Sequence, residues 1–543
     1  MKGSAGSLRP ISLLIAASAA LALAPAAEAR PADSKPSAQA CVALSRLQLP
    51  NTTVSSATVV DRGAGPALGI PGVADLPAFC RVVAHVRGAP DSDIGVEVWL
   101  PMEGWTGAFH GTGNGGFAGL LSSGYFSMAA GLRRGYATAT TDMGAAPATP
   151  LNGDALTGHP RKWKDWGRLS THEMTVTGKA LAAAFYGSAP TRAYYTGCST
   201  GGQQGLIEAL YYPADYDGIL VGAPVINRTW GHAAVLWDYA TSHRTPGSLL
   251  SPQKLQLLNT AAIASCTRQG RAVPGDPFVT DALECAFDPQ EIACRDAAST
   301  ACLTPDEVAT ARAFYAGPTR RDGRRAFYGW LPGSEAAGYF GWSFLQSASD
   351  GQPQFGGLFK WVFGASWSWE GFDLDRDMPR VDAALAADVN DATRGSLKAF
   401  RRRGGKLIIY HGLADTLVPP AQTVDFYQRQ ARELGGAARL GQVAKLFMAP
   451  GMAHCVGGPG PDSFNSAMGG ATPPAGSGGD HDLFQALVQW TDGGRAPERV
   501  IATKFTDDRS QIAFQRPVCA FPLKPVFRGG SRLSPDSFTC ARR

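Results

Sequence analysis

A serine between glycines is the residue of this sequence best placed for nucleophilic chemistry. Ser199 lies in the pentapeptide GCSTG, residues 197–201, which fits the pattern G-x-S-x-G. A strand-like segment at 191–197 precedes it and a helical pattern at 201–212 follows it. In a nucleophile elbow the serine occupies a strained turn between strand and helix, and small flanking residues permit the close backbone approach. This context predicts that Ser199 is a catalytic nucleophile.

A serine nucleophile needs a base and a group that orients the base. Asp415 follows the strand-like segment KLIIYHG, and His454 follows KLFMAP. On an α/β scaffold the acid precedes the histidine in the chain, and each lies on a loop after a strand. Alone, Asp415 fits a turn or helix cap, and His454 fits an ordinary loop histidine. The agreement of all three positions predicts a Ser199–His454–Asp415 triad.

Two members of this predicted triad have a cysteine as their neighbour. Cys198 precedes Ser199, and Cys455 follows His454. If the serine and the histidine meet in space, the two cysteines meet as well, which predicts a disulfide between them. Such a bond would fix the elbow to the histidine loop, and a triad misplaced by ~1 Å can lose ~100-fold in rate.

The first 29 residues have the pattern of a secretory signal peptide. Lys2 and Arg9 supply positive charge, residues 11–24 are apolar, and Ala27-Glu28-Ala29 is an A-x-A cleavage site. We therefore expect a secreted or periplasmic protein cleaved near Ala29, with no membrane span in the mature chain. Cleavage removes two positive charges and one negative charge, so the net charge falls from +5 to +4. This small excess does not indicate a nucleic-acid partner.

The elements that must position these residues alternate between strands and helices. This alternation predicts an α/β protein with a mainly parallel sheet. The motif Ser170-Thr171-His172-Glu173 fits a capping box that opens a helix, and HEMTV does not fit the metallopeptidase pattern HExxH. Residues 226–390 break the alternation and are dense in aromatic residues, which indicates an inserted domain. Strands are expected at 94–100, 135–144, 191–197 and 216–224. Further strands, each followed by a loop, are expected within 107–119, 404–420 and 444–458.

The motifs together resemble those of the tannase and feruloyl esterase family, which also contains mono(2-hydroxyethyl) terephthalate hydrolase. The resemblance implies an α/β-hydrolase fold with a large lid domain inserted over the active site. The domains would be a first hydrolase part at 30–225, the lid at 226–390 and a second hydrolase part at 391–543. The motifs that carry the resemblance are GNGGFAG (113–119), the HE at 172–173, GCSTGGQQGL (197–206), YDGILVGAP (216–224), CLTPDEVATARAFYAGP (302–318), HGLADTLVPP (411–420) and MAHCVGG (452–458).

The resemblance also implies an oxyanion hole. One donor would be the backbone N–H of Thr200, and the other would come from the glycine loop, where the match indicates Gly115. Loss of one such donor typically costs ~3–4 kcal/mol of transition-state stabilisation. The alternative interpretation of GTGNGG as a phosphate-binding loop lacks the Walker lysine.

Ten cysteines in an exported chain indicate a disulfide framework. No pair has the CxxC spacing of a zinc ribbon or a thioredoxin site. Beside Cys198–Cys455, sequence proximity and the family pattern imply Cys41–Cys80, Cys266–Cys285, Cys294–Cys302 and Cys519–Cys540.

The loop between Cys266 and Cys285 departs from the family pattern, in which several aspartates there often bind calcium. Calcium takes six to eight oxygens, usually with several carboxylates. We therefore expect no cofactor and a degenerate calcium site, although weak binding stays open. Acids are replaced by Thr267 and Gly270, Arg268 and Arg271 add positive charge, and only Asp276 and Asp281 remain.

The function favoured by these features is an exported serine esterase that hydrolyses esters of aromatic, phenolic acids through an acyl-enzyme on Ser199. Aromatic side chains of the lid suit a flat acyl group, but the sequence singles out no substrate-contact residue. Three alternatives remain: an amidase or peptidase on the same scaffold, a non-catalytic protein that binds phenolics, and a thiol redox protein. The intact triad speaks against the second, and the wide separation of Cys198 and Cys455 in the sequence speaks against the third.

Overall fold

The computed structural model describes residues 36–69, 75–295, 301–338, 340–349, 351–468 and 471–542, together with residues 1 and 3. The predicted signal peptide at 1–29 lies outside the described residues, apart from residues 1 and 3. In the described part of the chain, no helix combines the length and the apolar composition needed to cross a lipid bilayer.

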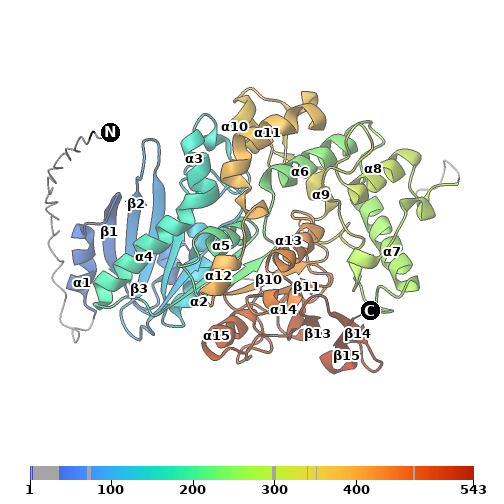
Figure 1. The fold of residues 1–543 in the computed structure, drawn as a ribbon. Helices are drawn as coiled ribbons and strands as arrows, with labels where there is room; N and C mark the ends of the chain where they lie inside the picture. Colours follow the sequence, from blue (N-terminus) through green and yellow to red (C-terminus); the bar gives the residue numbers. More distant parts are fainter. Residues whose placement is uncertain are drawn as a thin grey trace.

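A nine-stranded mixed sheet forms the centre of the molecule (Figure 1), in the order β1-β2-β3-β5-β4-β6-β7-β10-β11. In this order, the pairings from β1 through β2 and β3 to β5 are antiparallel. The pairings from β5 through β4, β6, β7 and β10 to β11 are parallel. The strands are β1 (Thr52–Val60), β2 (Phe79–Val86), β3 (Ile94–Pro101), β4 (Ala108–Thr112), β5 (Ala137–Thr141), β6 (Arg192–Cys198), β7 (Gly218–Gly222), β10 (Lys406–Gly412) and β11 (Ala444–Ala449).

Alternate residues of the parallel strands point to opposite faces of the sheet, and each face is covered by helices. Ile219 and Ile409 pack in the core under α4, α5 and α13. Leu220 and Ile408 pack on the other face, against α15. This two-sided burial explains the apolar runs that predicted these strands. The helices of this part are α1 (Ala38–Ala43), α2 (Tyr125–Leu132), α3 (Pro160–Lys164), α4 (Ser170–Tyr186), α5 (Thr200–Tyr211), α13 (Pro420–Glu433), α14 (Ala437–Leu440) and α15 (Leu483–Gly493).

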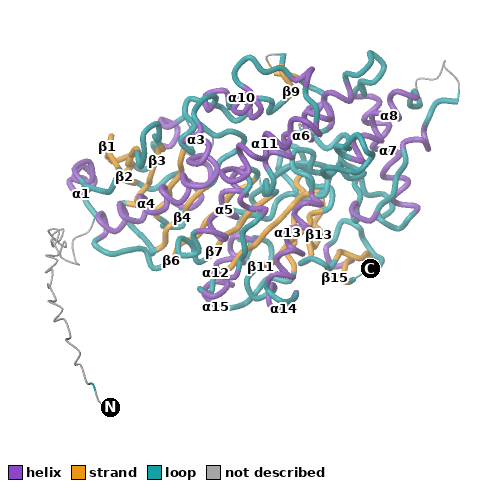
Figure 2. Tube along the Cα trace, turned by 45° about the horizontal axis from the view of Figure 1, so that its top comes forward, coloured by secondary structure: helices purple, strands orange, loops and turns teal. Residues whose placement is uncertain are grey.

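The segment between β7 and β10 adds no strand to the central sheet within the described residues. Its helices α10 and α11 lie at the top of Figure 1, and α7 and α8 lie at the right. Figure 2 shows α6 and α11 side by side above the strands. The predicted boundaries at 226 and 390 remain a prediction. The elements are α6 (Arg228–Ser242), α7 (Pro252–Arg268), α8 (Pro305–Ala316), α9 (Trp342–Leu345), β8 (Ala348–Ser349), β9 (Gln352–Pro353), α10 (Gly357–Phe363), α11 (Leu374–Val389) and α12 (Lys398–Arg402).

The C-terminal residues form two small hairpins that sequence reasoning did not anticipate. β12 (Arg499–Phe505) pairs with β13 (Ile512–Cys519), and β14 (Lys524–Phe527) pairs with β15 (Phe538–Ala541). Both lie at the bottom right of Figure 1.

The predicted capping box at Ser170 is wrong. A π-helical turn, Asp165–Leu169, joins α3 to α4, so Ser170 lies inside a continuous helical stretch and caps nothing.

The described cysteines form five disulfides, with the same pairings as those predicted. They are Cys41–Cys80, Cys198–Cys455, Cys266–Cys285, Cys294–Cys302 and Cys519–Cys540. Only the second joins segments that are far apart in the sequence, with a separation of 257 residues.

Candidate active site

Ser199 occupies the sharp turn between β6 and α5. Its backbone has φ 62° and ψ −120°, a conformation that L-residues rarely adopt. The turn is held because the Ser199 N–H donates to the carbonyl of Gly222 at 3.0 Å. A Cβ atom at Gly197 would lie 2.6 Å from the Gly201 carbonyl oxygen, so only glycine fits there. The strained turn exposes the serine at the end of the parallel strands, as a nucleophile elbow requires.

Asp415 and His454 form the second part of the site, on the loops after β10 and β11. His454 Nδ1 lies 2.8 Å from Asp415 Oδ2, and both residues are buried. The other carboxylate oxygen of Asp415 accepts the N–H groups of Leu417 and Val418 at 2.8 and 3.0 Å. The carboxylate is therefore fixed by its own loop, and it orients the imidazole through Nδ1.

A second histidine, His411, lies against the same carboxylate and was missed by sequence reasoning. Its Nε2 is 3.1 Å from Asp415 Oδ2, and its Nδ1 is 2.8 Å from the hydroxyl of Thr423. Burial alone would raise the pKa of Asp415, but the charge of His454 and the hydrogen bonds from His411 and His454 hold it well below its ordinary value. The only signal in the sequence was its place at the end of KLIIYHG, four residues before the acid.

The disulfide Cys198–Cys455 joins the elbow to the histidine loop, with Cα atoms 6.0 Å apart. Ser199 and His454 line one cavity. No Ser199–His454 hydrogen bond is present, and in enzymes without substrate this bond is often long or poorly aligned. The structure thus brings the three predicted triad residues to one place.

Two backbone N–H groups beside Ser199 are free to bind an oxyanion. In the described part of the chain, neither the Gly115 N–H nor the Thr200 N–H donates to a protein group. Thr200 is the first residue of α5, where N–H groups have no intrahelical acceptor. The glycine loop is fixed beside the helix because the Gly201 N–H donates to Asn114 O at 2.7 Å and the Asn114 N–H donates to Gln204 Oε1 at 2.9 Å. Both predicted donors therefore lie beside the elbow.

The cavity has a volume of about 600 Å³. It is lined by apolar side chains from α2 and from the segment between β7 and β10. Phe126 comes from α2, and Phe340 and Phe355 come from the segment between β7 and β10. The Phe340 ring lies perpendicular to the His454 ring, with centroids 6.0 Å apart. The hydroxyl of Thr416, next to Asp415, donates to the carbonyl of Phe340. The inserted segment therefore forms part of the wall around the candidate triad.

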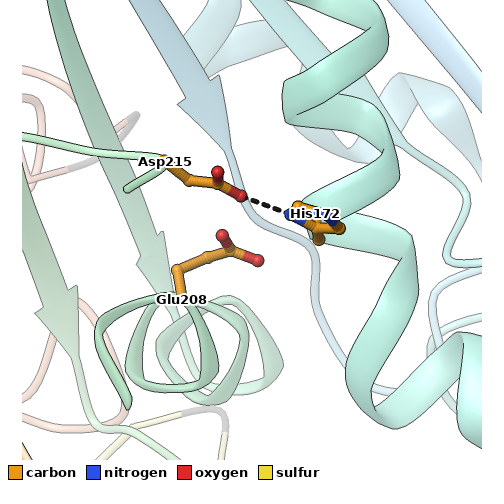
Figure 3. Close-up of side chains that lie close together, drawn as sticks. All are labelled: His172, Glu208 and Asp215. Atoms are coloured by element: carbon orange, nitrogen blue, oxygen red, sulfur yellow. Dashed lines mark hydrogen bonds and ion pairs between the residues drawn. The ribbon is translucent and has the colours of Figure 1, made fainter. Parts of the chain in front are cut away.

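A separate cluster near the other end of α5 could in principle hold a metal ion (Figure 3). His172 Nδ1 lies 2.6 Å from Asp215 Oδ2, and the carboxyl group of Glu208 points toward this pair. Ligand atoms of the three residues lie within 4.8 Å of one another. Burial and the neighbouring Asp215 raise the pKa of Glu208 well above its ordinary value. Glu173 of the HE motif is not part of this cluster.

The two aspartates of the loop between Cys266 and Cys285 are paired with basic side chains. The Asp276 carboxylate forms ion pairs with Arg516 and Arg532 at 3.0 and 3.4 Å. Asp281 forms ion pairs with Lys524 and Arg271 at 2.7 and 3.1 Å. Asp276, Asp281 and Arg516 are buried. Four basic side chains thus surround the two carboxylates that calcium would need.

Comparison with known proteins agrees with this geometry. A family profile described as tannase and feruloyl esterase matches residues 80–357 and 363–541. An uncharacterized esterase of Xanthomonas campestris pv. campestris is 36% identical over 540 residues, which are 92% of this chain and 91% of the relative. The mono(2-hydroxyethyl) terephthalate hydrolase of Piscinibacter sakaiensis is 29% identical over 561 residues, with 90% and 89% covered. The crystal structure of feruloyl esterase B from Aspergillus oryzae superposes with a TM-score of 0.81 at 25% identity, and 93% and 100% of the two chains are covered.

Proposed function

This chain belongs to the tannase and feruloyl esterase family and is a carboxylic ester hydrolase, and from that premise we propose that it cleaves esters of aromatic acids through an acyl-enzyme on Ser199. One observation carries the proposal. The strained Ser199, His454 and Gly115 line the same cavity, and Asp415 is paired with His454 at 2.8 Å. The Thr200 N–H, at the start of α5, follows Ser199 directly.

The mechanism follows from the roles that these positions permit. His454 accepts the Ser199 proton, and the serine Oγ attacks the ester carbonyl carbon. The N–H groups of Gly115 and Thr200 bind the oxyanion of the tetrahedral intermediate. The C–O bond to the alcohol breaks as His454 protonates the leaving oxygen, and water then hydrolyses the acyl-enzyme by the same steps. Asp415 keeps its charge and stabilises the imidazolium.

An aromatic acyl group is supported by the wall of the cavity. Phe126, Phe340 and Phe355 contribute flat apolar surfaces beside the nucleophile. Relatives named for ferulate and terephthalate esters lie in the same family. An aromatic ring buried between such side chains gains area burial and favourable ring contacts.

The test is hydrolysis of methyl ferulate, methyl gallate, mono(2-hydroxyethyl) terephthalate and p-nitrophenyl acetate by the mature protein. We expect turnover of at least one aromatic ester, and we expect Ser199→Ala to lower kcat by roughly 10⁶-fold, as in other serine hydrolases. Turnover of p-nitrophenyl acetate alone would refute the aromatic assignment. Full activity of Ser199→Ala would refute the acyl-enzyme.

We also propose that the protein is exported and needs no calcium. Five disulfides fit an oxidising compartment, and the ion pairs of Asp276 and Asp281 support folding without the metal. Calcium that bound only the folded state would raise the melting temperature. We expect EDTA and excess CaCl2 to give the same melting temperature and the same kcat. A calcium-dependent shift in either would contradict this proposal.

A further inference from the structure

A buried arginine lies behind the candidate oxyanion hole. Arg228, the first residue of α6, is only 3% exposed. Its Nη2 donates to Thr200 Oγ1 at 2.8 Å, and Nε and Nη2 both donate to Gln203 Oε1, at 3.0 and 2.7 Å. The guanidinium also lies 4.9 Å from the ring centroid of Trp166. It therefore contacts two residues of the helix that begins at the nucleophile.

Among the described residues this cation lacks an acidic partner. In the part of the chain that the structure describes, Arg228 forms no ion pair with a carboxylate. Burial lowers the pKa of Arg228 to about 9, which still leaves it charged at neutral pH. An uncompensated buried charge is costly to folding, whereas most arginines of this chain are exposed or paired. The position is one where a fixed positive charge could serve the reaction.

The direction of the hydrogen bonds links Arg228 to the glycine loop. A guanidinium only donates, so the Thr200 hydroxyl accepts from it and gives its own hydrogen to the carbonyl of Gly116 at 2.7 Å. On the other side of Gly115, the Asn114 carbonyl accepts the N–H of Gly201 at 2.7 Å. Gly115 is therefore held between two hydrogen bonds to the first turn of α5, and Arg228 fixes the orientation of one of them.

Arg228 also lies beside the nucleophile. A small cavity of about 30 Å³ is lined by Ser199, Gly116, Arg228 and His232. Burial and the charge of Arg228 hold the pKa of His232 well below its ordinary value, so the imidazole is neutral and the guanidinium is the positive charge of this cavity. A fixed charge in a site that excludes water stabilises developing negative charge far more than it does in bulk solvent.

We propose that Arg228 is a positioning residue of the oxyanion hole. It holds the Thr200 hydroxyl and, through it, the Gly115–Gly116 loop, and its charge stabilises the tetrahedral oxyanion. This inference rests on the proposed acyl-enzyme function and assigns a role to a residue that does not itself touch the substrate.

The test compares Arg228→Met, Arg228→Lys and Thr200→Val with Arg320→Met. Arg320 is a matched control because it also lies over a tryptophan, Trp230, but is paired with Asp375 at 2.9 Å. Active sites are counted with a serine-reactive phosphonate, so misfolded protein does not enter kcat. Loss of a direct oxyanion donor lowers kcat by ~10²–10³-fold. For Arg228→Met we expect kcat to fall by roughly 10–100-fold, with KM nearly unchanged.

Further readouts separate this role from a merely structural one. An aryl boronic acid forms an anionic tetrahedral adduct with the serine. Its affinity for Arg228→Met should be lower than for the wild type by the same factor as the reduction in kcat. The affinity for the aromatic acid product should be the same for both proteins. Arg228→Lys, which keeps the charge, should recover part of the loss. Thr200→Val keeps the backbone N–H and should also lower kcat. The reduction in kcat for the double variant of Arg228→Met and Thr200→Val should be smaller than the product of the two single reductions. Thr200→Val also tests the link if Arg228→Met does not fold.

The outcomes distinguish the two proposals. If the wild type hydrolyses an aromatic ester and Arg228→Met keeps its kcat and its boronate affinity, the role of Arg228 is refuted and the esterase remains. If the reduction in kcat is matched by Arg320→Met, the role is also refuted. If the wild type hydrolyses none of the esters, the proposed function itself fails.

Discussion

Two histidine–aspartate pairs lie near opposite ends of α5, and their geometry is nearly the same. At the N-terminal end His454 Nδ1 is 2.8 Å from Asp415, and at the C-terminal end His172 Nδ1 is 2.6 Å from Asp215. Only the first has a strained serine and free N–H groups beside it. A histidine oriented by a carboxylate is thus not a catalytic unit by itself, because its chemistry depends on what lies in front of the imidazole.

The buried carboxyl groups at the two ends show what decides their charge. Asp415 and Glu208 are both fully buried. Asp415 accepts two backbone N–H groups and faces two histidines, which hold its pKa low. Neither oxygen of Glu208 has a hydrogen-bond partner among the described residues, and its pKa is raised. For these two buried acids, the donors and charges around the carboxyl group, and not burial alone, decide the direction in which its pKa shifts.

The largest expected difference between the two pairs is in catalysis. Asp415→Asn should lower kcat by about 10⁴-fold, because the amide no longer stabilises the imidazolium and favours the wrong tautomer. Asp215→Asn, the same change at the other pair, should leave kcat nearly unchanged, because Asp215 pairs with His172 and not with a residue of the proposed triad. Steady-state kinetics on one aromatic ester compares the two. Similar losses would contradict the assignment of Asp415 as the catalytic acid.

The two ends of α5 also differ in the contact that holds each histidine segment in place. The N-terminal end is cross-linked by Cys198–Cys455, whereas the other end is held by the stacking of His172 on Tyr212, with centroids 4.1 Å apart. Replacing both cysteines by alanine should lower kcat by about 100-fold, since the histidine loop is then free to shift by ~1 Å. Removing Cys294–Cys302, which closes a short loop in the inserted segment, should lower the melting temperature without this loss of kcat. An unchanged kcat in the first variant would show that packing alone aligns the site.

The sequence predicted the parts of the site whose signals are local. Ser199 is identified by the glycines two residues before and after it, and Asp415 and His454 are identified because each follows an apolar strand. The strands β3, β7, β10 and β11 are identified from apolar runs, which burial on both faces favours. β5 and β6 are instead rich in threonine and aromatic residues, which also favour strands. Cys198–Cys455 followed once the triad was in place.

The features that sequence reasoning missed depend on contacts between distant segments. Arg228 acts on Thr200 and Gln203, 28 and 25 residues away, and nothing in its own neighbourhood marks it. The hairpin strands β12–β15 alternate only weakly in burial. β1 and β2, at one end of the central sheet, do alternate in burial along much of their length, and sequence reasoning passed over that signal. The capping box at Ser170 failed because the π-helical turn at Asp165–Leu169 continues the helix, so that tertiary packing overrides the local signal.

The last expected difference is in the pH dependence of stability at the C-terminal end of α5. The folded pKa of Glu208 lies above its ordinary value of 4.5, so its contribution to the free energy of unfolding is complete at low pH and is lost as the pH rises through the folded pKa. The contribution of Asp415 has the opposite sign and is lost as the pH falls below 3.8. Glu208→Gln cannot lose a proton, so its stability relative to the wild type should increase above pH 4.5 by up to about 1.4 kcal/mol per pH unit. Urea denaturation at pH 5, 6, 7 and 8, with Glu173→Gln as the control for a changed net charge, measures this difference. Parallel stability curves for Glu208→Gln and the wild type would mean that Glu208 is ionised at neutral pH, and the contrast with Asp415 would then be wrong.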